Sequence, residues 1–375
     1  YFAHVMQHHF LPTGRVRYFP SCESVGEGRF VSRLSPASWK ARVRRKVVDT
    51  TYLEGEFPAT SAPPFEVADG VRCVPAGEIA RLRERAERFT VIGAGKTALD
   101  ACVWLLEQGV AASAIRWIKP REAWWLNRRF HQPHALLPDF YRGIAIQLEA
   151  IAQATSVADL VARLEAEGFL MRIDPSVAPT MFRGAVISEA ELALLRRIDD
   201  VVRLGHVRKI GRDAIVLDEG STPTTEGTVH VHCAARGLPR PPLRPIFEPG
   251  RVTVQPFRWS FACYQFAMLG VVEATLESDE EKNRLCPPIA YWDANADYLS
   301  AFLAGLANDR ALAAYPVLAG WARDTRLNPL AGIALHRDVP SVVDTRERIR
   351  RFAAAASGNL LELIRAGTDQ PGPAR

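Results

Sequence analysis

Residues 87–122 read ERFTVIGAGKTALDACVWLLEQGVAASAIRWIKPRE. The spacing of apolar residues and glycines predicts a buried strand over 89–92, a glycine-rich turn over 93–95, a helix over 96–108 and a second strand over 115–118. A strand, a helix and a strand in this order form a right-handed crossover, which makes the two strands parallel neighbours. This stretch therefore predicts an α/β fold built on a parallel sheet.

The predicted turn carries the pattern G-x-G-x-x-A, which is typical of dinucleotide-binding sites. It consists of Gly93, Ala94, Gly95, Lys96, Thr97 and Ala98. Gly93 permits the tight turn, Gly95 leaves room for a pyrophosphate, and the small Ala98 lets the helix pack close to the strand. The helix N-terminus adds free N–H groups for the phosphates. Because the pattern follows a strand and opens a helix, we predict that these residues bind a dinucleotide.

The spacing excludes an ATPase-type phosphate loop, because its first glycine would fall at Thr90. The end of the second predicted strand bears on the choice between NAD and NADP. An acidic residue there would hold the ribose 2′-hydroxyl of NAD. Here Lys119, Pro120 and Arg121 come first and Glu122 follows. The cations Lys119 and Arg121 favour the 2′-phosphate of NADP(H), while Glu122 leaves NAD open.

The composition describes an ordinary soluble protein of 375 residues, long enough for two domains, with 48% hydrophobic and 24% charged residues. The net charge is +5, but the signs alternate and no block of five Lys or Arg occurs, so we expect no nucleic-acid partner. No apolar run approaches the ~20 residues of a membrane-spanning helix. We therefore expect no membrane partner and a cytoplasmic location.

Metal and thiol chemistry find little support in the sequence. The six cysteines are scattered without a CxxC pair, which argues against a zinc ribbon and a dithiol redox centre and favours free thiols in a reducing cytosol. His230 and His232 alternate on a predicted strand and so share a face, but Cys233 points the other way and no third ligand lies nearby. We predict no metal site.

The flanking segments are less regular. Residues 14–52, beginning with the strand-like RVRYFP of 15–20, predict a small antiparallel meander, and the proline-rich stretch 57–70 predicts a crossing loop. Helical periodicity marks 140–170 and 188–199, where Ser188 and Glu191 form a capping-box pattern. From Trp292 the chain is helical, and it ends in a tail that we expect to be disordered. The first ten residues, YFAHVMQHHF, look like the end of an amphipathic helix, so we expect an N-terminal truncation.

Several segments, in this order, resemble one family. They are the meander, KVVDTTY (46–52), the proline-rich crossing, VIGAGKTALDA (91–101), IRWIKPREAW (115–124) and TVHVHCAARGL (228–238). Together they resemble the two-dinucleotide flavoproteins, that is, FAD/NAD(P)-dependent oxidoreductases of the flavin-monooxygenase and pyridine-nucleotide-reductase type. The resemblance implies a Rossmann-type NAD(P)-binding domain inserted into an incomplete FAD-binding α/β domain with a β-meander, plus a helical C-terminal region.

The resemblance also implies domain limits. Residues 1–87 would form part of the FAD-binding domain and 88–228 the NAD(P)-binding domain. Residues 229–290 would return to the FAD-binding domain, and 291–375 would form the helical region with its tail. The strand over 47–52 would leave the FAD domain and residues 229–237 would re-enter it.

The same resemblance implies further cofactor contacts and an activity. Ala235 and Gly237 lie in a turn that meets the cofactor in the family, and Gln255 would lie near the flavin ring, with a helix starting near Phe261. The first fingerprint, which would hold FAD, is absent, as is the Gly-Asp pair that many relatives carry. The implied cofactors are NADP, with NAD open, and FAD.

A flavin performs most of its own chemistry, so catalytic side chains stay unassigned. The missing dithiol pair argues against a disulfide reductase. We expect an FAD-containing, NADPH-dependent oxidoreductase, monooxygenase-like, that transfers hydride from NADPH to the flavin and acts on a small molecule. The alternative is a non-catalytic NADP(H)-binding protein used for sensing or assembly. A homodimer is left open.

Overall fold

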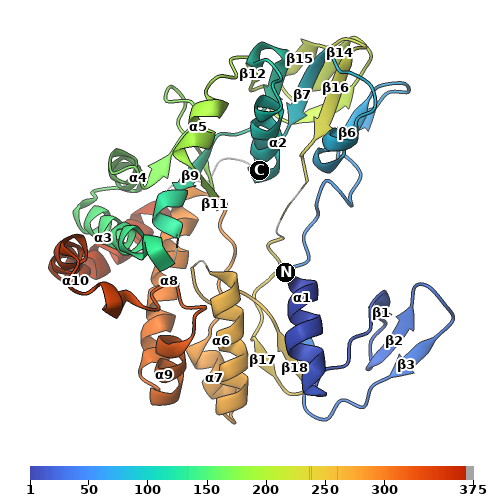
Figure 1. Cartoon of the computed structure of the whole chain (residues 1–375). Coiled ribbons are helices and arrows are strands. Elements are labelled where there is room, and N and C mark those ends of the chain that lie inside the picture. Colours follow the sequence, from blue (N-terminus) through green and yellow to red (C-terminus); the bar gives the residue numbers. More distant parts are fainter. Residues whose placement is uncertain (133, 236, 238, 260, 369–375) are drawn as a thin grey trace.

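The structure is a computed structural model that describes residues 1–132, 134–235, 237, 239–259 and 261–368. The fold is mixed α/β, with several sheets and a helical C-terminal region (Figure 1). This confirms the predicted α/β class. Within the described ranges, no helix is both long enough and apolar enough to span a bilayer.

The sheet that contains the glycine-rich turn has five strands in the order β12-β8-β7-β16-β6, and every neighbouring pair is parallel. Its strands are β6 (Cys73–Pro75), β7 (Arg88–Ile92), β8 (Ile115–Ile118), β12 (Val201–Val202) and β16 (Thr228–His232). The predicted strands over 89–92 and 115–118 are therefore confirmed, as is their parallel pairing. β16 lies beside β7 in this sheet, so the predicted boundary between residues 228 and 229 falls within a strand that pairs with the fingerprint strand.

The two faces of this sheet are covered differently. The predicted helix over 96–108 is confirmed as α2 (Lys96–Glu107), and it packs with α5 (Glu189–Leu195) on the face that carries Val91 and Trp117. A second sheet, β15-β14-β13-β5, covers the face that carries Ile92 and Ile118. Its strands are β5 (Glu66–Val67), β13 (Val207–Ile210), β14 (Ala214–Leu217) and β15 (Gly220–Pro223).

Between β8 and β12 the chain makes a long excursion away from the five-stranded sheet. The prediction included this segment in the NAD(P)-binding domain. The segment forms the sheet β10-β9-β11 and two long helices. Its elements are β9 (Ala123–Asn127), α3 (Leu137–Gln153), α4 (Val157–Ala166), β10 (Leu170–Met171) and β11 (Met181–Ile187). These share a core with α8 (Asn295–Ala313) and α10 (Pro340–Thr368). The predicted helical stretches and the Ser188–Glu191 capping box are confirmed.

A third small sheet, β17-β18-β4, lies in the lower part of Figure 1 beside three helices. Its strands are β4 (Val47–Asp49), β17 (Phe247–Glu248) and β18 (Arg251–Thr253), and β4 runs parallel to β18. The helices α6 (Ala262–Thr275), α7 (Asp279–Leu285) and α9 (Pro316–Asp324) complete this part of the molecule. Phe261 is the N-cap of α6, which confirms the predicted helix start.

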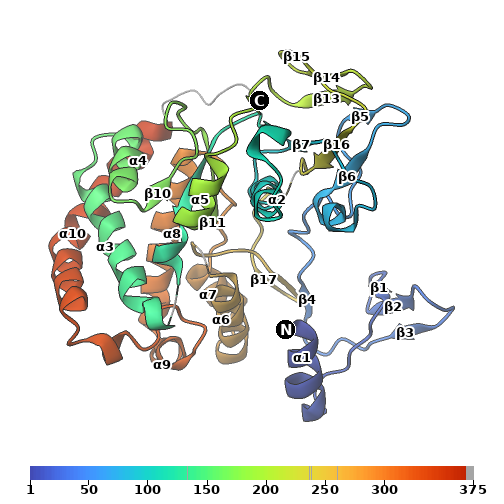
Figure 2. The same ribbon diagram turned by 45° about the horizontal axis from the view of Figure 1, so that its top comes forward.

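The N-terminal part of the chain stands apart from these cores, as Figure 2 shows. The helical turns of α1 (Phe2–Val5) and residues 6–10 confirm the predicted helix, with Phe2 82% exposed. The antiparallel meander comprises β1 (Cys22–Ser24), β2 (Arg29–Ser32) and β3 (Ser38–Lys40). The expected strand over 15–20 is wrong: Pro20 and the left-handed Ser21, with φ 53°, turn the chain before β1 begins. β4 also lies outside the meander, because it pairs with β18.

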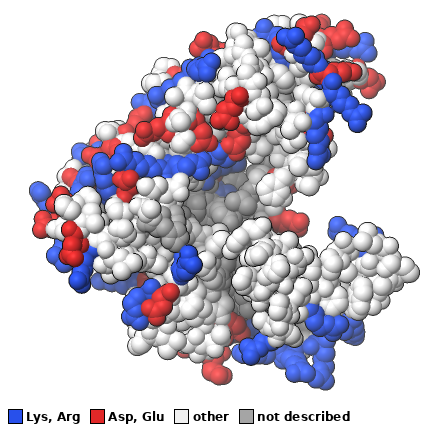
Figure 3. Space-filling model, in the orientation of Figure 1, with Lys and Arg blue, Asp and Glu red and all other residues white. Residues whose placement is uncertain are grey.

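The alternation of charge signs does not hold in this N-terminal part. Residues 14–48 contain nine Lys or Arg and two Glu, a net charge of +7. Lys and Arg side chains gather along the lower edge of the molecule in Figure 3. At the other end, α10 extends to Thr368, and the predicted disordered tail from Asp369 lies outside the described residues.

Candidate dinucleotide site

The turn after β7 requires glycine at its first position. Gly93 has φ 140°, and a Cβ there would lie 2.8 Å from the carbonyl oxygen of Cys233. The Gly93 N–H donates to the carbonyl of Ile118 at 3.0 Å, and Trp117 Nε1 donates to the Gly93 carbonyl at 2.8 Å. The turn is therefore held against both neighbouring strands, β8 and β16.

Gly95 has a different role, because its backbone conformation suits any residue. It is the N-cap of α2 with φ −93°, and nothing lies within 4 Å of a Cβ built at this position. No side chain among the described residues caps α2, so the N–H groups of Lys96 and Thr97 at its start have no side-chain partner there. A helix start with free N–H groups beside an open glycine can accept an anion.

The remaining fingerprint residues divide between core and surface. Ala98 is fully buried on the face of α2 that packs against the sheet, where a larger side chain would push the helix away. Lys96 forms ion pairs with Asp100 and, at 3.4 Å, with Glu191, and Thr97 is exposed at the helix start. The helix thus packs closely against the sheet and leaves its first turn accessible.

A cavity adjoins this turn at the carboxyl ends of β7, β8 and β16. The volume of the cavity itself is about 150 Å³, which is smaller than the ~300–1,000 Å³ typical of small-molecule sites, and with the solvent at its mouth the space reaches about 520 Å³. β8 and β16 flank β7 on opposite sides, so the cavity lies where the chain connections change direction, the usual ligand position in such sheets. It is lined by Pro64, Phe65, Ile92, Gly93, Ile118, Pro120, Gly205, His206, Val207, Arg208 and Ala234.

Lys119 does not face this cavity, contrary to the prediction from the sequence. It lies two residues after Trp117 and shares its face of the sheet, opposite to Ile118, which lines the cavity. Its side chain is 2% exposed, with Nζ 2.6 Å from Glu122 Oε1 and 4.4 Å from the centroid of the Trp117 ring. Burial lowers the pKa of Lys119, and the Glu122 carboxylate opposes that shift.

Glu122 is also buried and ion-paired. Its carboxylate also accepts from Arg203 at 2.7 Å, and Arg203 in turn bonds Asp174 at 2.8 Å. Neither Lys119 nor Glu122 is therefore offered to a ribose or its phosphate. The sequence could not show this, because the direction of a side chain after a strand depends on which sheet face is covered.

Arg121 is more accessible but is also paired. Its Nη2 donates to both carboxylate oxygens of Asp293, at 3.0 and 2.9 Å, and Arg183 Nε donates to Asp293 at 2.8 Å. Burial alone would raise the pKa of Asp293, but the bonds from the two arginines lower it, so the carboxylate is ionised. Arg121 thus connects the loop after β8 to the segment that precedes α8.

His206 and Arg208 line the cavity and form a cluster with Asp218 behind them that the sequence did not reveal. Asp218 accepts the His206 backbone N–H at 2.7 Å, lies 3.2 Å from His206 Nδ1, and accepts from Arg208 Nε. These three residues lie in a β-hairpin with no recognisable motif. They are identified as candidate site residues only because His206 and Arg208 line the same cavity as Gly93 and Pro120.

The predicted cofactor residues after β16 lie elsewhere. Gly237 accepts from the Glu56 N–H at 3.2 Å, so the chain leaving the lower sheet and the chain returning to it run side by side. Ala235 is half-buried just before this bridge, and Arg236 and Leu238 lie outside the described residues.

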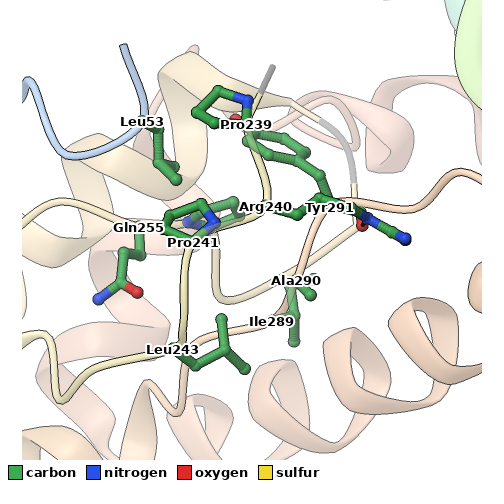
Figure 4. Close-up of a pocket in the computed structure, with 10 residues that line it drawn as sticks. Leu53, Pro239, Arg240, Pro241, Leu243, Gln255, Ile289, Ala290 and Tyr291 are labelled. Carbon is green, nitrogen blue, oxygen red and sulfur yellow. Dashed lines mark hydrogen bonds between the residues drawn. The ribbon is translucent and has the colours of Figure 1, made fainter. Parts of the chain in front are cut away.

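Gln255 is buried and is engaged by backbone groups. Its Oε1 accepts from the Arg244 N–H at 3.2 Å, and its Nε2 donates to the Arg244 carbonyl at 2.9 Å. It adjoins a small hollow with Tyr291 and Ala290, and in Figure 4 its amide points away from those two residues. This amide therefore holds a loop in place, and the fingerprint turn and Gln255 belong to different parts of the molecule.

His230 and His232 share a sheet face, as the alternation predicts. His230 contacts Thr224 Oγ1 at 3.0 Å and the Arg72 carbonyl at 3.2 Å, and His232 packs edge-on against Phe65. Burial lowers the pKa of both imidazoles. Across the residues with described positions, no three His, Cys, Asp or Glu gather in a way that could hold a metal ion.

The chain is similar to three mycobacterial proteins. They are the uncharacterized proteins Rv2000 and MT2056 from two strains of Mycobacterium tuberculosis and the uncharacterized protein Mb2023 from Mycobacterium bovis. Each is 41% identical over 334 residues, which cover 89% of this chain and 62% of the relative. The chain therefore spans less than two thirds of the length of these relatives. No family model and no solved structure matches.

Proposed function

We propose that this protein binds NADP(H) at the turn after β7 and is an FAD-containing, NADPH-dependent oxidoreductase of the monooxygenase-like type. The observation that carries the proposal is the Gly93–Gly95 turn. Gly93 is required by both its φ and its contact with Cys233, while Gly95 leaves open space over the first N–H groups of α2. This is the shape that a pyrophosphate needs, and the cavity beside Gly93 lies open to solvent where the adjoining nucleoside would extend.

The proposal includes a Rossmann-type domain inserted into a second α/β unit. The parallel sheet around β7 would be the NAD(P)-binding part. In support, Glu56 and Gly237 pair where the chain passes between the two sheets, and β4 and β18 pair with Asp49 opposite Thr253. A domain inserted into another leaves and re-enters its host at one place, which requires such paired segments.

The two cofactors have unequal support. NADPH would supply a hydride, and the residues at the fingerprint turn fit its pyrophosphate. FAD would be the hydride acceptor, but the chain has no second G-x-G-x-x-G/A pattern for the FAD pyrophosphate. The flavin part of the proposal therefore rests on the resemblance to two-dinucleotide flavoproteins. If FAD does not bind, the protein would be an NADP(H)-binding protein without redox chemistry.

A charge placed at Gly95 tests the dinucleotide site without disturbing the fold. Aspartate is a favoured N-cap residue, and Gly95 has room for a side chain, so Gly95→Asp should fold with unchanged or higher stability. Its carboxylate would occupy the pyrophosphate position, so we expect NADPH affinity to fall by roughly tenfold or more, about 1.4 kcal/mol. Titration of NADPH fluorescence measures this. Gly77→Asp, at another glycine with open space, is the matched control.

The visible spectrum then separates the two functions. A yellow protein that bleaches when NADPH is added without oxygen supports the oxidoreductase. A protein that stays colourless with added FAD, yet binds NADPH, would support the alternative of a non-catalytic NADP(H)-binding protein. If the wild type and Gly95→Asp bind NADPH equally weakly, the dinucleotide site itself is wrong.

A further inference from the structure

The wall of the cavity opposite the fingerprint turn is the start of β13. Residues 205–208 line the cavity there, across from Gly93 and Pro120. Among the described residues that line it, Arg208 is the one Lys or Arg. A nucleotide whose pyrophosphate lies at the turn would extend its adenosine half along this cavity.

The backbone of this wall is irregular at two points, and both concern the same cluster. Gly205 has φ 79°, and a Cβ there would lie 2.6 Å from the Cβ of Asp218, so glycine allows the two strands to meet. Arg208 is an extra residue in the pairing of β13 with β14, because Val207 faces Leu217 and Lys209 faces Val216. Such a β-bulge redirects a side chain and is frequent beside binding sites.

Asp218 holds both side chains of this wall in place. The His206 backbone N–H is the main cause that lowers the pKa of Asp218, with Arg208 and the His206 ring adding to it. The carboxylate therefore stays ionised and accepts from Arg208 Nε. The guanidinium keeps its remaining N–H groups, and the side chain is 67% exposed. A planar fork with several donors matches the geometry of a phosphate.

The two cations that the sequence predicted to contact the 2′-phosphate form ion pairs with other residues. Lys119 lies on the opposite face of the sheet with Glu122, and Arg121 pairs with Asp293. A cofactor phosphate in the cavity would thus meet Arg208 without first breaking an interior ion pair, since Asp218 binds only one edge of its guanidinium.

We propose that Arg208, with His206 beside it and Asp218 positioning both, recognises the adenosine 2′-phosphate and sets a preference for NADPH over NADH. The proposal rests on the proposed function, because it assumes that a dinucleotide occupies this cavity. It moves the specificity determinant from the loop after β8 to the bulge of β13.

Affinities for NADPH and NADH in one set of variants test this. We expect Arg208→Gln to weaken NADPH binding by about tenfold or more and NADH binding by less than about twofold, since only the former carries the phosphate. His206→Ala should move the ratio in the same direction by a smaller factor. Lys209→Gln removes the same charge from the same strand outside the cavity lining, so it should leave the ratio unchanged.

The outcomes separate this inference from the proposed function. A wild type that binds neither nucleotide would refute the proposed function. A wild type that binds both, with the same NADPH/NADH ratio in Arg208→Gln, would refute only the role of Arg208. If Arg121→Glu lowers the ratio and Arg208→Gln does not, recognition belongs to the loop after β8. Urea unfolding of each variant shows that it is folded under the binding conditions.

Discussion

Lys119 Nζ lies 2.6 Å from Glu122 Oε1, and both side chains are almost completely buried beneath the parallel sheet. The pair lies three residues apart in the loop after β8, where the sequence predicted an exposed phosphate contact. It is a structural ion pair, because Arg203 and Asp174 extend it into a network of alternating charge. Removal of one member should therefore affect stability more than nucleotide binding.

Glu122→Gln should destabilise the protein by about 3 kcal/mol, because it leaves Lys119 and Arg203 without their shared carboxylate. The free energy of unfolding in urea at neutral pH measures this effect. Glu84→Gln removes a carboxylate that is 81% exposed and lies 3.8 Å from Arg72. That control should change stability by less than about 0.5 kcal/mol. Equal effects of the two substitutions would contradict the structural role of Glu122.

The cost of Glu122→Gln should also depend on pH. Burial already lowers the pKa of Lys119 from its ordinary value of 10.5, and loss of the opposing carboxylate lowers it further. A lysine whose folded pKa lies below its unfolded pKa binds fewer protons when folded, so stability rises with pH through that window. The stability deficit of the variant should therefore shrink as the pH rises toward the ordinary lysine pKa of 10.5. A constant deficit would mean that Lys119 stays charged in the variant.

The two glycines of the fingerprint should respond differently to alanine. Gly93→Ala places a Cβ 2.8 Å from a backbone carbonyl at φ 140° and should cost about 1–3 kcal/mol. Gly95→Ala meets open space at an ordinary φ, so its effect on stability should stay within about 1 kcal/mol. Urea unfolding compares the two. An equal loss in both variants would contradict the different roles of the two positions.

Glu191 should contribute to the loss of folding stability at low pH. Burial alone would raise the pKa of Glu191, but the Ser188 backbone and hydroxyl, Arg128 and Lys96 lower it to about 2. Its ionised form therefore stabilises the fold above its ordinary pKa of 4.5, and this contribution is lost as the pH falls through about 2.

Glu191→Gln should reduce the loss of stability between these two pH values by roughly 2 kcal/mol, because glutamine does not titrate. Glutamine at this position still permits a capping box, so helix α5 should be retained. Urea unfolding at several pH values, compared with Ser188→Ala, separates the charge from the cap. An unchanged acid profile would show that other carboxylates control this range.

Local structure in this protein follows closely from local sequence. The β7–α2–β8 unit and the Ser188–Glu191 cap agree with the sequence pattern. Each depends on contacts within a few residues, such as a side chain bonding the first turn of its own helix or a glycine adopting a positive φ.

Long-range pairing could not be predicted in the same way. The sequence alone did not show that β6 and β16 join the fingerprint sheet, that the excursion from β9 to β11 packs on α8 and α10, or that β4 pairs with β18. These partners are far apart along the chain, and short strands of similar composition pair equally well with several neighbours.

The candidate site shows the same division within a few residues. The amino-acid sequence by itself determined the glycine turn and the helix start, which are features of one continuous segment. Only the tertiary structure decided which cation meets the cavity. Side chains alternate between sheet faces, so Lys119 turns to the covered face, while a hairpin about ninety residues further along the chain brings Arg208 to the open one. Which charge a ligand would meet depends on how the sheet faces are covered, and that covering comes from distant parts of the chain.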